Sequence, residues 1–227
     1  MQALSRLKRS LLSLMLGLVA ASSASAMEFA VRRNDDGLRM VVARGPIVAG
    51  DTERLRRALE EADRDRQGAK LVALNSPGGQ IGEAVSMAGL IAQEKVSTVV
   101  WPSTTCASAC AQIVFLAGEY HYVMDRGRLG LHICAIRKSP ELSSECNELI
   151  ARLAALHGVS LPTLLAYLEP KDPAKPKWLN AEQADCWGLT RWPPGVNRGV
   201  GPDEVPPCLV KAAQAAVNRP TGNPPPR

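Results

Sequence analysis

The sequence predicts an α/β domain with a largely parallel sheet. Short apolar segments alternate with amphipathic segments along the middle of the chain, which is typical of strands and helices that succeed one another. The composition, with 46% hydrophobic and 22% charged residues, is ordinary for a globular protein and excludes collagen, coiled coil and general disorder. Only 4% of the residues are aromatic, so we expect aliphatic and alanine side chains to fill the core.

The first strand and the first helix have clear boundaries in the sequence. Residues 38–42 form an apolar strand, which a Gly-Pro pair ends. Asp51 or Thr52 then caps an amphipathic helix that continues to about Asp65. Further strands are expected at 70–74, 96–100, 122–124 and 129–134. Further helices are expected at 81–93, 107–117, 140–157 and 162–168.

The tail of the chain, residues 193–227, differs from the part before it. Nine of the 17 prolines lie between Pro193 and Pro226, so regular structure there must be short. We expect one short helix within residues 204–218, tethered by Cys208, and disorder from Arg219 to the end.

The first 26 residues are typical of a secretory signal peptide. A basic start precedes an apolar run at 11–21 that is too short to span a bilayer, and A-S-A at 24–26 is a cleavage signal. An uncleaved anchor is the alternative. Three of the 27 basic residues and none of the 22 acidic residues lie in this segment, so residues 27–227 carry a formal charge of +2. We therefore expect a periplasmic or secreted protein without a nucleic-acid partner.

Six cysteines in an exported chain predict up to three disulfides. Their spacing favours the pairs Cys134–Cys146 and Cys186–Cys208. Cys106 and Cys110 can each bond to a partner elsewhere, or remain small buried residues. The chain has no C-x-x-C pair and only three scattered histidines, so we expect no metal site.

A Gly-Gly turn follows the strand expected at 70–74. In the segment N-S-P-G-G, Gly78 and Gly79 let the backbone approach a ligand closely and point N–H groups outward. Such groups at the start of a helix can stabilise an anion, including the oxyanion of acyl transfer. A simple tight turn is the alternative.

Ser108 lies among small residues in the segment C-A-S-A-C-A, where a buried helix is expected to begin. A nucleophile needs such a place, because it must be exposed at a sharp turn with little bulk around it. The N–H of Ala109 would then face the oxyanion. A serine that merely caps the helix is the alternative.

His132 lies in the apolar segment G-L-H-I-C, 24 residues after Ser108. A general base must come within hydrogen-bond reach of the nucleophile, which neighbouring strands of one sheet allow. A buried histidine of the core is the alternative. His121 and His157 are weaker candidates, because the first lies in a turn-like stretch and the second at a helix end.

Taken in order, these segments resemble the proteolytic subunit of the Clp protease, within the superfamily that includes the crotonases. The resemblance covers about residues 38–189 and rests on five segments: LVALNSPGGQI, CASACAQIVFLAG, LGLH, LAALHGVSL and LNAEQA-x-x-WGL. It implies a repeated β-β-α superhelix with a mainly parallel sheet and a helical segment after the His132 strand. We expect this domain to span residues 27–192.

The resemblance also implies a role for each matching residue. Ser108 matches the nucleophile, and His132 matches the general base that later protonates the leaving amine. Gly79 and Ala109 match the two N–H groups of the oxyanion hole, and Gly78 shapes the turn. No cofactor is implied.

The third catalytic residue is where the sequence departs from the family pattern. Counting back from the L-N-A segment reaches Pro176, which cannot serve, whereas counting forward from the preceding helix reaches Asp172 within one residue. Asp172 is therefore the candidate for orienting His132, with Glu169 and Asn180 as alternatives.

A different catalytic pair is also open. Exported relatives of the signal-peptide-peptidase type use a Ser–Lys dyad, which makes Lys138 a weaker candidate for the base. The alternative is a lysine on the solvated surface.

These observations predict an exported, ATP-independent serine peptidase that acts on peptides or unfolded protein segments. We expect no ATPase partner, because ATP is not supplied outside the cytoplasm. The resemblance implies a homo-oligomer assembled through residues 143–155, where Leu149, Ile150, Leu153 and Ala154 form an apolar stripe, although this stripe can instead pack inward. A non-catalytic scaffold with the same fold is one alternative. A crotonase-type acyl-CoA enzyme is another, against which export and the Ser–His pair argue.

Overall fold

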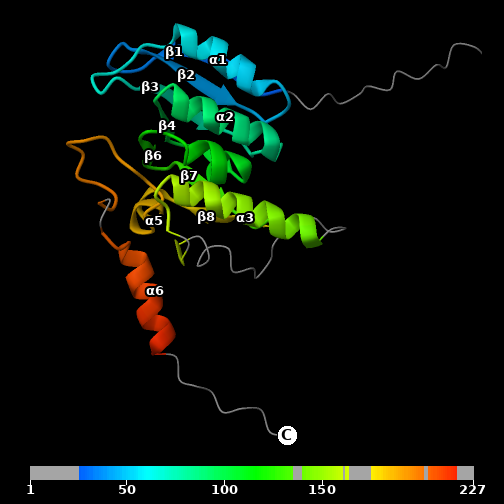
Figure 1. Cartoon of the computed structure of the whole chain (residues 1–227). Coiled ribbons are helices and arrows are strands. Elements are labelled where there is room, and N and C mark those ends of the chain that lie inside the picture. The colour runs from blue at the N-terminus through cyan, green and yellow to red at the C-terminus, as the bar shows by residue number, and fades with distance from the viewer. Residues whose placement is uncertain (1–25, 135–139, 161, 164–174, 202–203, 219–227) are drawn as a thin grey trace, which may run out of the picture.

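Two sheets form the framework of this protein (Figure 1). The computed structural model describes residues 26–134, 140–160, 162–163, 175–201 and 204–218. Within them, the main sheet has the order β1-β2-β3-β4-β6. Its strands are β1 (Glu28–Arg33), β2 (Arg39–Arg44), β3 (Lys70–Asn75), β4 (Val96–Val100) and β6 (His121–Val123). Only β1 runs antiparallel to its neighbour; β2, β3, β4 and β6 are parallel.

The smaller sheet carries the segments that lead to Ser108 and to His132. It has the order β5-β7-β8, with β5 (Thr105–Ala107) parallel to β7 (Arg128–Leu131) and β8 (Lys177–Leu179) antiparallel to β7. A parallel bridge between Ser76 and Cys106 joins it to the end of β3. The prediction of an α/β fold with mainly parallel sheets is confirmed.

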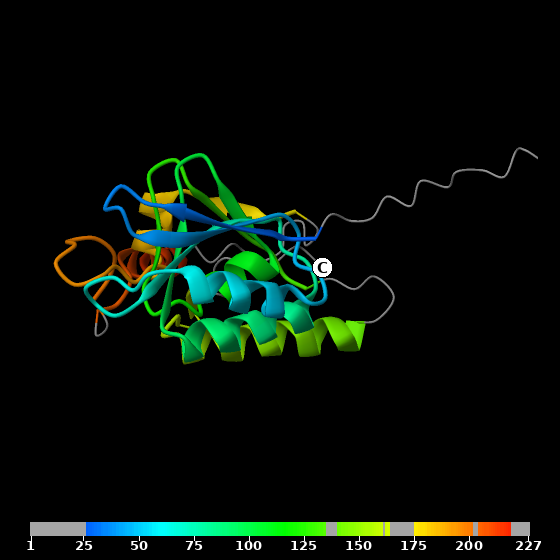
Figure 2. The ribbon, with the colours of Figure 1, turned by 90° about the horizontal axis from the view of Figure 1, so that it is seen from above.

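The helices α1 (Asp51–Glu61), α2 (Ile81–Gln93) and α3 (Pro140–Leu156) lie on one side of the strands (Figure 2). A short π-helix, η1 (Cys110–Phe115), packs against α2 and α3. Leu55, Met87, Ile91 and Phe115 from these helices are fully buried. Aliphatic side chains therefore fill most of the core, as the low aromatic content predicts.

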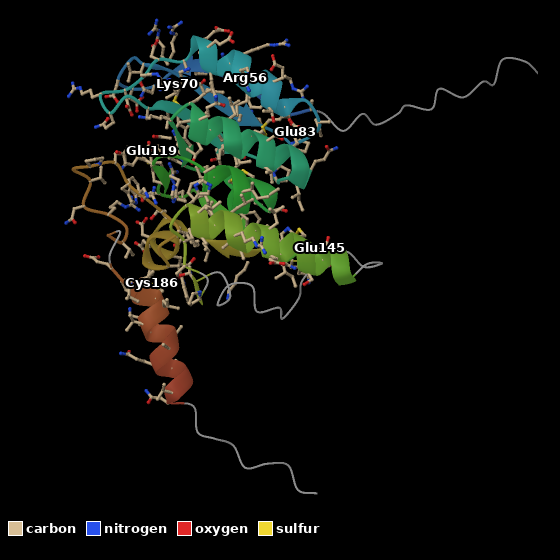
Figure 3. The ribbon with its side chains drawn as sticks, viewed as in Figure 1. Arg56, Lys70, Glu83, Glu119, Glu145 and Cys186 are labelled. Carbon is tan, nitrogen blue, oxygen red and sulfur yellow. A yellow bond between two sulfur atoms is a disulfide. The ribbon has the colours of Figure 1, made fainter. Side chains whose placement is uncertain are left out.

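In the described part of the chain, two helices follow the smaller sheet. They are α5 (Ala181–Cys186) and α6 (Pro207–Val217), and α6 extends away from the sheets (Figure 1). The disulfide Cys186–Cys208 attaches α6 to the end of α5, where Figure 3 labels Cys186. Arg198 ties the intervening loop to the domain, because it stacks on Trp192 and contacts Asp185 at 3.1 Å. The described part of the tail is thus held at two points.

The predicted elements differ from the structure mainly where tertiary contacts set the bounds of a helix or strand. The helix expected at 107–117 is wrong in its first residues, because Thr105–Ala107 pairs with β7 and only then does η1 begin. The last residues of the strand expected at 129–134 lie outside β7, which ends at Leu131. A helix was also expected at 162–168. Only residues 162 and 163 of it are described, and the rest lies outside the described residues.

The start of α1 also differs from the prediction. Gly50 is the N-cap, in place of Asp51 or Thr52. Asp51 is fully buried and accepts a hydrogen bond from the Val48 amide at 2.6 Å, which fixes the turn before the helix. Thr52 instead donates both its amide and its hydroxyl to Glu83 of α2, labelled in Figure 3, at 2.7 Å each. These bonds join α1 to α2 and lower the pKa of Glu83.

Three disulfides are present. Cys134–Cys146 and Cys186–Cys208 confirm the predicted pairs. The expectation that Cys106 and Cys110 bond elsewhere or stay unpaired is wrong, because they bond to each other. The chain passes from β5 into η1 within four residues, which brings their Cα atoms to 5.4 Å.

The apolar stripe of α3 packs mostly inward. Ile150 and Ala154 are 3% and 0% exposed, and Leu153 is half-buried against the core. Leu149 stays 38% exposed, and Leu156 beyond the stripe is 79% exposed. The homo-oligomer therefore stays a prediction. None of the helices in the described part of the chain is long and apolar enough to cross a membrane.

Candidate active site

Three turns meet beside the smaller sheet, each at the carboxyl end of a strand. They follow β3, β5 and β7 and carry Gly78, Ser108 and His132. The Ala107 amide donates to the Ser76 carbonyl at 2.9 Å, and the Ser108 amide donates to the Gly130 carbonyl at 2.8 Å. Backbone hydrogen bonds therefore hold the first two turns and the strand that leads to His132 next to one another.

Ser108 occupies a sharp turn between β5 and η1. Its φ of 56° lies in the left-handed region, which a residue with a side chain adopts at a cost in free energy. The side chain is half-buried, and its neighbours Ala107 and Ala109 are small and buried. A positive φ at a strand-to-helix turn presents a serine hydroxyl in the manner that a nucleophile requires.

Close contacts, and not only the turn itself, require glycine at positions 78 and 79. A Cβ on Gly78 would lie 2.6 Å from the Ala107 carbonyl oxygen and 2.7 Å from the Ser108 Cβ. A Cβ on Gly79 would lie 2.1 Å from the Ile47 carbonyl oxygen. The backbone at Gly78 thus lies directly against the Ser108 turn.

The amides near Ser108 divide into bonded and unbonded ones. The Gly78 amide donates to Ser76 Oγ at 3.1 Å, so it is engaged within the turn. Among the described residues, no group accepts a hydrogen bond from the amides of Gly79 or Ala109. These two amides therefore have no acceptor among the described residues, as the expected oxyanion-hole role requires.

His132 follows β7 and is half-buried. Its Nδ1 lies 2.8 Å from the carbonyl oxygen of Ile133. Because a carbonyl oxygen can only accept, Nδ1 carries the proton of the neutral ring, and Nε2 keeps the lone pair that a base needs. No hydrogen bond joins Ser108 Oγ to His132 within the described residues.

The segment after His132 is fastened to α3. The Cys134 amide donates to Asn147 Oδ1 at 2.8 Å, and Asn147 Nδ2 donates to the Cys134 carbonyl at 3.1 Å. The disulfide Cys134–Cys146 crosses at the same place. These contacts limit how far the main chain on the carboxyl side of His132 can move.

Two candidates for the third catalytic residue, Asp172 and Glu169, lie outside the described residues. Lys138, the candidate base of the alternative Ser–Lys pair, lies outside them too. Asn180 lies inside them, exposed at the start of α5, where its side chain accepts a hydrogen bond from the Gln183 amide at 2.9 Å. That capping bond already engages the amide oxygen of Asn180, which argues against this alternative.

His121 is a core histidine. It is 2% exposed, packs edge-on against Phe115, and its Nδ1 donates to the Gly118 carbonyl at 3.0 Å. Burial lowers its pKa to about 4. His157 is half-buried at the end of α3, and burial lowers its pKa too. Neither histidine lies at the three turns.

Gln112 is a site residue that the sequence analysis did not single out. It lies in η1 and is 1% exposed, and its Oε1 lies 3.5 Å from the His132 amide nitrogen. Its Nε2 is buried, and none of the described residues offers it a hydrogen-bond partner. A single amide within the apolar run A-C-A-Q-I-V-F-L-A was the signal that could have identified it.

No cluster of three or more metal-ligating side chains occurs among the residues whose positions are described. A cavity of about 660 Å³ lies away from Ser108, beside Met40, Leu71 and Tyr122 on the face of the main sheet opposite the helices. It contains none of the site residues.

Comparison with known proteins supports the fold. No protein-family model and no curated protein matches the chain. The structure is similar to that of a mutant ClpP1 from Listeria monocytogenes, with a TM-score of 0.51 and 21% sequence identity. The match covers 66% of this chain and 86% of the other. At this identity the likeness shows a Clp/crotonase fold and no more.

Proposed function

We propose that this ClpP-like chain is an exported, ATP-independent serine peptidase that hydrolyses peptide bonds through Ser108 and His132. The observation that carries the proposal is the Ser108 turn itself. A half-buried hydroxyl at a φ of 56° lies next to the turn of Gly78 and Gly79, and the amides of Gly79 and Ala109 have no acceptor in the described part of the chain. A helix cap needs neither the left-handed turn nor the free amides.

The proposed chemistry has two steps. Ser108 Oγ attacks the carbonyl carbon of the peptide bond while His132 Nε2 takes the hydroxyl proton, and the amides of Gly79 and Ala109 donate to the developing oxyanion. The C–N bond then breaks, and the imidazolium gives its proton to the leaving amine. Water attacks the acyl-serine with His132 again as base, which releases the carboxylic acid and returns the proton to Ser108.

The proposal requires His132 Nε2 to come within about 2.6–3.2 Å of Ser108 Oγ in the reacting complex. Hydrogen bonds of this kind are often long in unliganded enzymes and tighten when substrate binds. Asp172 is the proposed orienting carboxylate, and it would accept the Nδ1–H hydrogen bond that the Ile133 carbonyl now accepts. Losing such a carboxylate can reduce the rate by about 10⁴-fold.

The proposed surroundings follow from the same chemistry. Three disulfides favour an oxidising compartment, so we place the protein in the periplasm or outside the cell. The proposed substrates are peptides or unfolded protein segments, because their peptide bonds can reach a half-buried serine more readily than those of a folded chain. A homo-oligomer is proposed as the working form, without an ATPase partner and without nucleic acid.

A fluorophosphonate probe tests the proposal. Purified, oxidised protein comprising residues 27–227 is labelled and compared with Ser108→Ala, His132→Ala and Asp172→Asn. We expect labelling that is abolished by Ser108→Ala and strongly slowed by His132→Ala and Asp172→Asn. His157→Ala is the matched control, because His157 is half-buried but lies away from the turns, and it should label as wild type does.

A non-catalytic scaffold is the second candidate. The absence of a Ser108–His132 hydrogen bond among the described residues is the observation that favours it. No labelling of the folded, disulfide-intact wild-type protein would contradict the peptidase and support the scaffold.

A further inference from the structure

Gln112 joins the two residues on which the proposed chemistry depends. Its main-chain amide donates to the Ser108 carbonyl at 2.9 Å, and its side-chain Oε1 lies 3.5 Å from the His132 amide nitrogen. An amide nitrogen can only donate, so the oxygen of the Gln112 side chain must face His132. One residue of η1 therefore contacts both the nucleophile turn and the main chain of the base.

The surroundings of Gln112 do not otherwise call for a polar side chain. Its neighbours Ile113, Val114 and Phe115 are all at most 1% exposed, as is Gln112 itself. Its Nε2 is buried without a partner among the described residues, which costs stability. An apolar side chain of similar size would fill the same space without that cost. The amide therefore has a use that packing does not supply.

The helix form at this position is a separate observation. The segment Cys110–Phe115 is a π-helix, in which each backbone hydrogen bond spans five residues instead of four. Such turns are rare and occur frequently at functional sites. The π-helix begins two residues after Ser108 and includes Gln112.

We propose that Gln112 is a positioning residue of the Ser108–His132 site, and this proposal rests on the serine peptidase function proposed above. Its Oε1 fixes the main chain of His132 against the helix that follows Ser108. The Ile133 carbonyl fixes the ring of His132 through Nδ1. The base is thus held at its main chain and at its ring, with Nε2 left to act.

Three substitutions of Gln112 separate the acceptor oxygen from side-chain size and polarity. Gln112→Met keeps the size and removes the acceptor, and Gln112→Asn keeps the amide but shortens its reach. Gln112→Glu keeps an oxygen at the same distance. We expect labelling of Ser108 by the fluorophosphonate to slow by about 10- to 100-fold in the first two variants, because small misplacements of a catalytic group have effects of this size. Gln112→Glu should recover most of the rate.

A second readout does not depend on activity. Hydrogen exchange of the His132 amide, followed by NMR, should accelerate at least tenfold in Gln112→Met and Gln112→Asn and stay near wild type in Gln112→Glu. The matched control is Ser97→Ala, because Ser97 is 3% exposed, its Oγ has no partner among the described residues, and it lies in β4 away from the site. That control should change neither readout.

The two readouts distinguish the failure of each proposal. Wild-type labelling and wild-type His132 exchange in Gln112→Met would overturn the role of Gln112. If Gln112→Met does not fold, the same comparison is made with Gln112→Asn. If wild-type protein does not label, the peptidase function fails. The exchange rates then still decide whether Gln112 holds His132.

Discussion

Ser108 adopts a backbone conformation that costs about 1–3 kcal/mol in a residue with a side chain. Several contacts hold it there: its amide donates to Gly130 at 2.8 Å, its carbonyl accepts from Gln112 at 2.9 Å, and Gly78 lies against its Cβ. Neighbouring segments therefore impose this conformation, and substitutions in them should displace the hydroxyl of Ser108.

Gly78→Ala is expected to displace the Ser108 turn. The new Cβ would lie 2.6 Å from the Ala107 carbonyl oxygen and 2.7 Å from the Ser108 Cβ, at a φ of 92° that already disfavours alanine. We expect labelling of Ser108 to fall by at least about 100-fold and the free energy of unfolding to fall by about 1–3 kcal/mol. Probe kinetics and urea unfolding measure the two effects.

Gly82→Ala is the control for this substitution. Gly82 lies in α2, and a Cβ there would meet nothing within 4 Å. Alanine should leave labelling unchanged and raise stability by up to about 1 kcal/mol, because glycine is a poor helix former. Equal labelling of Gly78→Ala and wild type would show that the glycine turn does not shape the site.

At the scale of residues, the sequence was informative where chemistry requires unusual residue types. Ser108 among alanines and the glycines at 78–79 are visible in the sequence as a pattern. Gln112 was not found, because its contact with His132 depends on how η1 packs against the end of β7. Whether Ser108 and His132 meet could not be predicted either, since that is a matter of ångströms between separate strands.

At the scale of elements, the disulfide Cys106–Cys110 encloses Ser108 in a ring of five residues between β5 and η1. Both cysteines are fully buried. We expect the double variant Cys106→Ala/Cys110→Ala to lose about 2 kcal/mol of unfolding free energy, because such a short loop constrains the unfolded chain little. Labelling of Ser108 should nevertheless slow by about tenfold or more, because the turn loses its cross-link.

The disulfide Cys186–Cys208 provides the matched comparison. It closes a loop with a sequence separation of 22, so Cys186→Ala/Cys208→Ala should lose more stability, about 3 kcal/mol. Labelling should stay at the wild-type rate, because α6 lies away from the site (Figure 1). If both double variants label equally fast, the ring around Ser108 has no positioning role.

Elements were predicted best where local pattern and tertiary environment agree. The helix at 81–93 and the strand at 96–100 have the predicted bounds, because their apolar periodicity matches the faces they bury. β1 and β8 went unpredicted, since each is short or rich in charge and forms by pairing with β2 or β7. Strand pairing likewise converts the start of the helix expected at 107–117 into β5.

At the scale of the whole molecule, His121 makes stability depend on pH. Burial lowers its pKa to about 4, below the value near 6.5 of an unfolded chain. Arg191 and His157 act in the same direction, while the bond to the Gly118 carbonyl opposes them. On acidification the imidazole therefore takes up a proton at a higher pH in the unfolded state than in the folded state. The contribution of His121 to the free energy of unfolding is fully present above pH 6.5 and is lost as the pH falls toward 4. The loss from this residue is about 3 kcal/mol.

Urea unfolding of wild type and His121→Asn between pH 7.5 and 4 measures this contribution. The asparagine amide can keep a donor near the Gly118 carbonyl but does not titrate. The difference in unfolding free energy between the two proteins should be constant above pH 7. On acidification the wild type should lose more stability than the variant. Parallel curves down to pH 4 would contradict the assignment of this pH dependence to His121.

The fold class could be predicted because the order of the motifs and the alternation of strands and helices both indicate it over most of the chain. The division into two sheets could not, since it depends on β5 pairing with β7 rather than with a strand of the main sheet. The tail helix was expected to be tethered by Cys208, and Arg198 in addition fixes the loop before it through Asp185 and Trp192. Such contacts between distant residues leave no periodic trace in a sequence.

The π-helix after Ser108 has a consequence for how such a site can change over time. A π turn holds more residues than an α turn, so the loss of one residue from Cys110–Phe115 would restore an ordinary helix. The glycine turn and Ser108 would keep their places in the sequence. Side chains on either side of the turn would keep their orientation, because a π turn takes up its extra residue locally. Side chains inside the turn, Gln112 among them, would move relative to the main chain of His132. A change in length, with no change in Ser108 or His132, would thus be enough to remove the contact on which the proposed positioning rests.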